Sequence, residues 1–99
     1  MGKKSANKDE KAHMTAVAAL GCIVCRNLGY PDSPAAIHHT RASAGGGQRS
    51  SHYEVLPLCP THHQTGGYGV AFHAGSECWQ RKYGTEVELL EQVRKLLEP

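Results

Sequence analysis

The sequence has little of the bulky apolar material from which a small protein builds its core. It contains one Phe and one Trp among 99 residues, and hydrophobic residues of all kinds make up 39% of it. A chain of this length holds one small domain, which burial of so few large side chains leaves marginally stable. We therefore expect a further source of stability, such as a bound metal ion.

Long hydrophobic runs are also absent. The longest, Ala16–Leu20, is far too short to cross a bilayer, which excludes a membrane-spanning protein. The lysines near the N-terminus have no apolar stretch directly behind them, so no signal peptide is evident. The expected compartment is the cytoplasm, where cysteines stay reduced.

A strong excess of one charge is lacking as well. The formal net charge is +2, which mildly favours a polyanionic partner but is too small to establish one. Charge alone therefore does not decide between nucleic acid and other partners.

Cysteine and histidine, in contrast, are abundant and clustered. The chain has four Cys and seven His. Most of them fall into Cys22-x2-Cys25, His38-His39 and Cys59-x2-His62-His63, with His73 following. In a reducing compartment, two disulfides are a weaker interpretation of four cysteines than a domain held together by metal.

The first constellation consists of two short hooks, C-x2-C and C-x2-H. Its residues are Cys22, Cys25, Cys59 and His62. Each hook places two soft ligands on one side of a turn, and together they form a closed tetrahedral set that predicts a structural Zn²⁺. The alternative is buried free cysteines with an incidental histidine. Cys78 has no partner at hook spacing, so we expect it to be a small buried apolar residue beside Trp79.

The second constellation is made of imidazoles alone: His38, His39, His63 and His73. Adjacent residues of a strand point to opposite faces, so we expect one of His38 and His39 to bind a metal and the other to face a reacting water. On a helix, His63 is rotated by about 100° from His62 and faces a different site. Such a set leaves room for water or substrate, as catalytic metal sites do. The alternative is a group of exposed histidines on a basic surface.

Local patterns predict an α+β domain over residues 9–99 behind a flexible basic tail over residues 1–8. The predicted elements are a helix over 8–20 closed by Gly21, a tight turn over 22–25, extended segments over 35–40 and 53–58, and a flexible loop over 41–51. They continue with a helix from Pro60 that glycines interrupt, a short helix over 76–83, and a helix after the Thr85/Glu88 capping box. Pro57 suggests an edge strand. The last helix places Val87, Leu90, Val93 and Leu97 on one face, which we expect to be core or a dimer seam rather than a docking site for another protein.

The chain resembles HNH (ββα-metal) nucleases, which are built on a treble-clef zinc scaffold. The resemblance rests on Cys22-x2-Cys25, on Ile37-His38-His39, and on the second strand running into Cys59-Pro-Thr-His62-His63. The runs over residues 57–64, 70–75 and 82–84 are similar, more specifically, to the recombination-enhancement, RecA-dependent nucleases of temperate phages. The resemblance implies a zinc-stapled treble-clef/ββα-metal domain with flanking N- and C-terminal helices, in the host cytoplasm if the chain is phage-encoded.

The resemblance also assigns roles to single residues. It implies that His38, His63 and His73 hold a catalytic Mg²⁺, Mn²⁺ or Zn²⁺ and that His39 is the general base. Arg41, two residues beyond that base, is a candidate phosphate clamp or a solvated loop charge, and Arg49 and Arg26 are weaker candidates. The Asn of the HNH motif has no counterpart. Glu54 stands near its place, with His52 close by, so the residue that orients His39 is unassigned.

The implied function is a metal-dependent DNA endonuclease of phage recombination that leaves 5′-phosphate and 3′-hydroxyl ends. Whether the DNA is single-stranded, and whether a RecA filament takes part, stays open. Two alternatives belong to other classes: a non-catalytic zinc module that binds nucleic acid or protein, and a metal carrier or sensor that uses the imidazole site.

Overall fold

Two short antiparallel strands lie at the centre of the fold. The structure, a computed structural model, describes residues 7–30, 33–40 and 52–98. Strand β1 (Ala36–His39) pairs with β2 (Val55–Leu58) in a two-stranded sheet, with His38 opposite Leu56 and His39 opposite Val55. Pro57 therefore lies in an edge strand, as its missing N–H requires. The described part of the chain confirms the α+β class.

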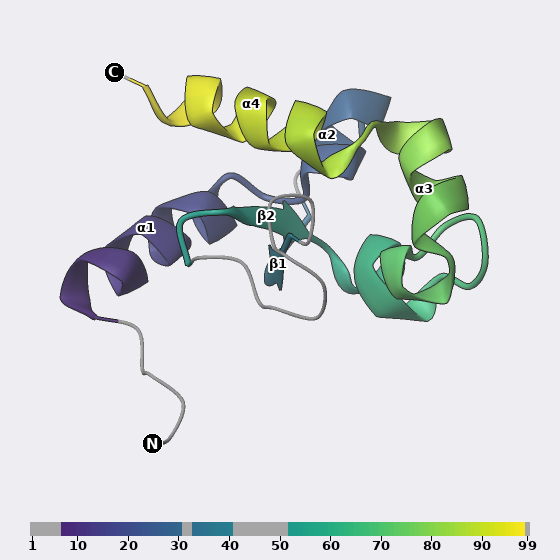
Figure 1. Cartoon of the computed structure of the whole chain (residues 1–99), viewed down its shortest axis with the longest axis horizontal. Coiled ribbons are helices and arrows are strands. Elements are labelled where there is room, and N and C mark those ends of the chain that lie inside the picture. Colours follow the sequence, from purple (N-terminus) through teal and green to yellow (C-terminus); the bar gives the residue numbers. More distant parts are fainter. Residues whose placement is uncertain (1–6, 31–32, 41–51, 99) are drawn as a thin grey trace.

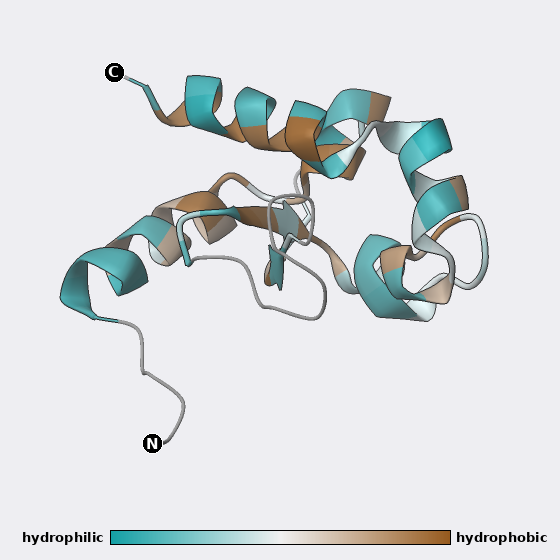
Figure 2. Ribbon diagram, in the orientation of Figure 1, coloured by the Kyte–Doolittle hydropathy of each residue, from teal (hydrophilic) through white to brown (hydrophobic). Residues whose placement is uncertain are grey.

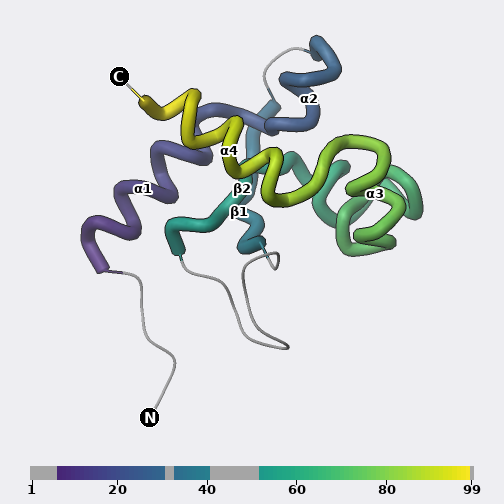
Figure 3. Tube along the Cα trace, turned by 45° about the horizontal axis from the view of Figure 1, so that its top comes forward, coloured from purple at the N-terminus to yellow at the C-terminus, as the bar shows by residue number. Residues whose placement is uncertain are grey.

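Helices surround these strands (Figure 1). The helices α1 (Lys8–Ala19), α2 (Ile23–Leu28) and α4 (Glu86–Leu97) all pack against β2. A π-turn η1 (Thr61–Thr65), a 3-10 turn η2 (Phe72–Ala74) and α3 (Ser76–Tyr83) follow β2 and pack on one another. The tube view shows this second group at one end of the molecule, with α1 and α4 running past the strands (Figure 3). None of the described helices is long and apolar enough to span a membrane.

Capping boxes fix where both long helices begin. The Asn7 side chain accepts a hydrogen bond from the Glu10 backbone N–H, and the Glu10 carboxylate accepts one from the backbone N–H of Asn7, both at 2.8 Å. Thr85 and Glu88 form the same reciprocal pair at α4, as the sequence predicts. Each cap contributes about 1 kcal/mol to helix stability. Residues 1–6 of the predicted tail lie outside the described residues, and Lys8 is the first residue of α1.

The core is small and includes metal-ligand residue types. Trp79 is its largest fully buried side chain, and Cys22, Cys25 and Cys59 are buried within the same cluster as the aliphatic residues. Figure 2 shows hydrophobic residues on the side of α4 that faces the strands and hydrophilic residues on its outer side. The cluster joins α1, α2, β2, α3 and α4, so the described elements share one core.

Two local predictions are wrong, and a third is right in position but not in helix type. The tight turn over 22–25 is instead the start of helix α2, which runs on to Leu28. The interrupted helix expected from Pro60 is present as a short π-helix capped by Gly66, where a Cβ would meet the carbonyl oxygen of Thr61 and lie 2.6 Å from Val70 Cγ1. Val87 is 55% exposed, because the buried face of α4 is centred one position earlier. That face contains Glu86, Leu89, Leu90 and Val93.

Candidate metal centres

Four buried residues from three segments converge at the first candidate metal site. Cys22 is the N-cap of α2, and its Sγ accepts a hydrogen bond from the backbone N–H of Cys25 at 3.5 Å. Cys59 directly follows β2, and His62 lies on the π-turn. The ligand atoms of these four residues all lie within 4.8 Å of one another. The two hooks predicted from the sequence therefore meet in space.

The spacing of these atoms matches a tetrahedral ion. With metal–sulfur bonds of about 2.3 Å and metal–nitrogen bonds of about 2.0 Å, a tetrahedron has sulfur–sulfur edges of about 3.8 Å and sulfur–nitrogen edges of about 3.5 Å. Cys25 Sγ lies 3.8 Å from Cys59 Sγ. Nδ1 of His62 lies 3.3 Å from Cys59 Sγ, 3.5 Å from Cys25 Sγ and 3.7 Å from Cys22 Sγ. A Cys₃His set of this kind fits a metal such as zinc.

Electrostatics also favours a cation at this site. Burial raises the pKa of the Cys22 thiol to about 11, since a thiolate there loses its hydration and faces two further sulfurs. Burial lowers the pKa of His62, with Lys82 adding to the effect, so its imidazole is neutral, the form that binds metal. A divalent ion that binds here would displace the thiol protons and compensate the charge of the resulting thiolates.

The second candidate site brings together three of the predicted histidines. Ring nitrogens of His38, His63 and His73 lie within 4.8 Å of one another, and Nε2 of His63 is 3.0 Å from Nε2 of His73. Burial, followed by the neighbouring imidazoles of His38 and His73, lowers the pKa of His63 to about 4, so this ring is neutral at physiological pH. His63 is thus able to offer a lone pair to a divalent ion.

This second site is open on one side. His38 is buried, His63 is half-buried and His73 is exposed, in contrast to the fully buried Cys₃His set. A hollow beside it is lined by Phe72, His73, Ala74, Gly75 and Ser76. Three protein ligands with free space next to them characterise catalytic metal sites, whereas four buried ligands characterise structural ones.

A buried carboxylate from the last helix holds His38. Nε2 of His38 lies 2.7 Å from Oε2 of Glu86, and the two side chains are 1% and 3% exposed. Glu86 lies in the first turn of α4, 48 positions along the chain from its partner. Sequence patterns did not single out Glu86. The sequence signal that could have found it is the spacing of Glu86, which places it on the same helix face as Leu89, Leu90 and Val93.

His39 lies next to a different histidine. The three-histidine set found among the described residues does not include it. Nε2 of His39 instead lies 2.9 Å from Nδ1 of His52, and both side chains are half-buried. His52 and Glu54 are the residues near the position of the missing motif Asn, and His52 is the one whose ring contacts His39. Glu54 meets Thr40 through its backbone, where its carbonyl oxygen accepts the Thr40 N–H at 3.1 Å.

Five other residues named in the sequence analysis are placed as follows. Arg41 and Arg49 lie outside the described residues, and Arg26 is exposed on α2. Cys78 is half-buried rather than fully buried, and it belongs to neither of the ligand sets found in the described part of the chain. Trp79 is core, as expected, and its Nε1–H donates to the carbonyl oxygen of His62 at 3.1 Å.

An α+β fold with a closed Cys₃His cluster beside an open histidine cluster defines a small protein with metal-binding capacity. The sequence pattern of a known family, described as "recombination enhancement, RecA-dependent nuclease", matches residues 6–98. The chain therefore belongs to this family of nucleases. None of the curated proteins matches it.

Proposed function

We propose that this chain is a metal-dependent DNA endonuclease of the HNH type, with a single catalytic domain over residues 9–99. It would act in phage recombination, in the cytoplasm of the host, on DNA held in a RecA filament. The observation that carries the proposal is the pairing of a closed Cys₃His cluster with an open cluster of His38, His63 and His73. A purely structural zinc module has no need of the second cluster.

The residues divide the chemistry between them. Cys22, Cys25, Cys59 and His62 would hold a structural Zn²⁺, and His38, His63 and His73 would hold the catalytic divalent ion. A divalent ion bound there supplies Lewis-acid stabilisation of the charge that develops on the phosphate and on the leaving 3′ oxygen. The strand pleat directs the His38 and His39 side chains to opposite faces of β1, so these neighbours serve different roles.

His39 would act as the general base. An imidazole accepts a proton from water near neutral pH, and the attack of that water on phosphorus leaves 5′-phosphate and 3′-hydroxyl ends. His52 would orient this base. The contact that supports this role is the 2.9 Å distance between Nε2 of His39 and Nδ1 of His52. Arg41, two positions further on, is proposed to contact the substrate phosphate.

Plasmid nicking tests the proposal directly. Supercoiled and single-stranded DNA would be incubated with the zinc-loaded protein in Mg²⁺, Mn²⁺ or EDTA, with and without a RecA filament. We expect metal-dependent cleavage that His39→Ala abolishes while folding and bound zinc are retained. His13→Ala is the matched control, because His13 is a half-buried histidine of α1 that contacts the Tyr53 ring. It should cleave like the wild type.

The opposite outcomes are equally specific. A folded, zinc-replete wild type that cuts no DNA under any condition would favour the non-catalytic zinc module. Unfolding of His39→Ala would show that His39 is structural and remove it from the chemistry.

A further inference from the structure

The contact between His38 and Glu86 fixes the state of a proposed metal ligand. A carboxylate oxygen only accepts hydrogen bonds, so Nε2 of His38 carries the proton in this 2.7 Å contact. Nδ1 is then the nitrogen with a free lone pair. The ring also lies edge-on to His63 and His73, with ring centroids 5.2 Å and 5.4 Å away. Glu86 therefore contacts a ring that also packs against the two other histidines of the cluster.

Several interactions of α4 hold Glu86 itself in place. The carboxylate lies in the first turn of the helix, where the helix dipole favours negative charge. The backbone N–H of Glu86 donates to Oε1 of Gln80 in α3 at 3.0 Å. Leu89, Leu90 and Val93 continue the same face into the core. A side chain fixed so thoroughly, and buried with its partner, is suited to aligning a ligand.

We propose that Glu86 is a positioning residue of the catalytic metal site. It would hold His38 as the Nε2–H tautomer, which leaves Nδ1 to bind the ion, so that α4 supports a site whose ligands come from β1, η1 and η2. This inference rests on the proposed function, because it takes His38, His63 and His73 as the ligands. Carboxylates that accept the second N–H of a ligating histidine typically raise metal affinity by about 10–100-fold.

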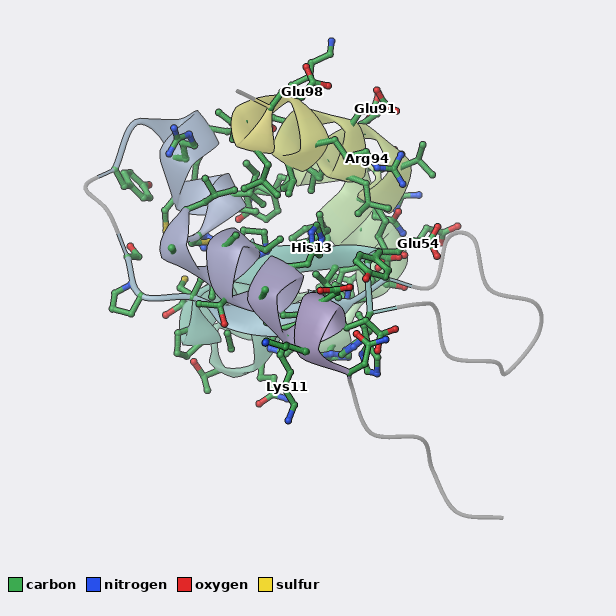
Figure 4. The ribbon with its side chains drawn as sticks, turned by 90° about the vertical axis from the view of Figure 1, so that its left-hand side faces the viewer. Lys11, His13, Glu54, Glu91, Arg94 and Glu98 are labelled. Carbon is green, nitrogen blue, oxygen red and sulfur yellow. The ribbon has the colours of Figure 1, made fainter. Side chains whose placement is uncertain are left out.

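A metal-affinity comparison tests this role without reference to cleavage. Full-length protein with its Cys₃His site loaded with Zn²⁺ would be titrated with Mn²⁺, for wild type, Glu86→Gln and Glu86→Leu. Leu removes the acceptor. Gln keeps the shape but offers both a donor and an acceptor, so it no longer specifies one tautomer. The matched control is Glu91→Gln, the same substitution on the outer face of the same helix, where Figure 4 shows Glu91 pointing outward.

We expect Mn²⁺ affinity to fall about tenfold in Glu86→Gln and by up to about 100-fold in Glu86→Leu, and to stay unchanged in Glu91→Gln. Nitrogen-15 NMR of the His38 ring before Mn²⁺ is added should show the Nε2–H tautomer in the wild type and mixed tautomers in Glu86→Gln. If Glu86→Leu does not fold, Glu86→Gln still decides the question, because it preserves volume and the buried contact.

Two results would overturn the inference, and they are distinguishable. Folded Glu86→Gln with wild-type Mn²⁺ affinity would show that Glu86 is a structural partner only, and would leave the proposed function standing. If the wild type does not bind Mn²⁺, or if His63→Ala binds it as well as the wild type does, the three histidines do not form a metal site. The proposed catalytic function would then fail together with this inference.

Discussion

His62 and His63 are consecutive residues whose rings belong to two different metal-ligand clusters. Nδ1 of His62 faces three thiols, whereas Nε2 of His63 lies 3.0 Å from Nε2 of His73. Both residues lie in a π-turn, a rare local structure that occurs frequently at functional sites. Because one turn carries ligands for both clusters, we expect His63 to keep its position in the open cluster only while the buried cluster is formed.

Loss of the buried ion should therefore disrupt the three-histidine site, whereas loss of an ion from the three-histidine site should leave the buried cluster intact. A mild chelator that takes only the ion of the three-histidine site should leave the helical circular dichroism unchanged. A strong chelator that strips the Cys₃His site should unfold the chain and abolish Mn²⁺ binding, since binding of a structural zinc is worth about 10–16 kcal/mol in small metal-folded domains. Metal analysis alongside circular dichroism measures both steps. Retained helicity after complete zinc loss would contradict the structural role.

Cys22 and Cys78 should respond differently to substitution by serine. Cys22→Ser should leave a purified chain unfolded and depleted of zinc, because serine is a poor zinc ligand and Cys22 also caps α2. Cys78→Ser provides the matched control, since Cys78 lies on α3 outside both clusters, and it should fold and hold one zinc in the buried site. Zinc content per chain and thermal unfolding check the pair. A well-folded, zinc-replete Cys22→Ser protein would contradict the assignment.

His52 should matter for cleavage but little for folding. His52→Ala removes the partner of His39, so the base samples other orientations, and we expect kcat to fall by about 10–100-fold, within the usual contribution of general base catalysis. Substitution by Asn or Gln, each of which can accept the His39 N–H, should restore part of the rate. Full activity of His52→Ala would show that another group orients His39.

Gly66 should be more sensitive than its neighbour Gly67. A Cβ at Gly66 would meet the backbone of Thr61 and the Val70 side chain, so Gly66→Ala should distort the π-turn and cost about 2–3 kcal/mol, as overpacking does. Gly67 has φ +84° with open space around it, so Gly67→Ala should cost about 1 kcal/mol of backbone strain. Urea unfolding of the zinc-loaded proteins measures both. Equal losses would argue against a tight turn at Gly66.

Sequence reasoning succeeded where the signal is local. The predicted bounds of α3 are those observed, the end of α1 differs by one residue, and the capping box of α4 forms between Thr85 and Glu88 as expected. The two hooks of the Cys₃His set also meet in space, as do His38, His63 and His73 of the second cluster. These features depend on short spacings, caps and donor chemistry, all of which can be read from neighbouring residues.

Contacts between distant segments could not be read in this way. No local pattern connects His38 with a carboxylate 48 positions away, nor His39 with His52, which is 13 positions away. The apolar stripe of α4 was misplaced by one position because Val87 is a good apolar candidate, whereas a glutamate on a buried face is unexpected until its partner is known.

The shared π-turn limits how the length of this chain can vary. The segment from Cys59 to His63 should tolerate no change in length, because one inserted or deleted residue would rotate the His62 or the His63 ring out of its own cluster. Between His63 and His73 the chain passes through a turn at residues 68–70, where Tyr68 is 74% exposed. Insertions should therefore be tolerated near Tyr68 and rejected between Cys59 and His63. A library of single-residue insertions scored for zinc retention would map this boundary directly.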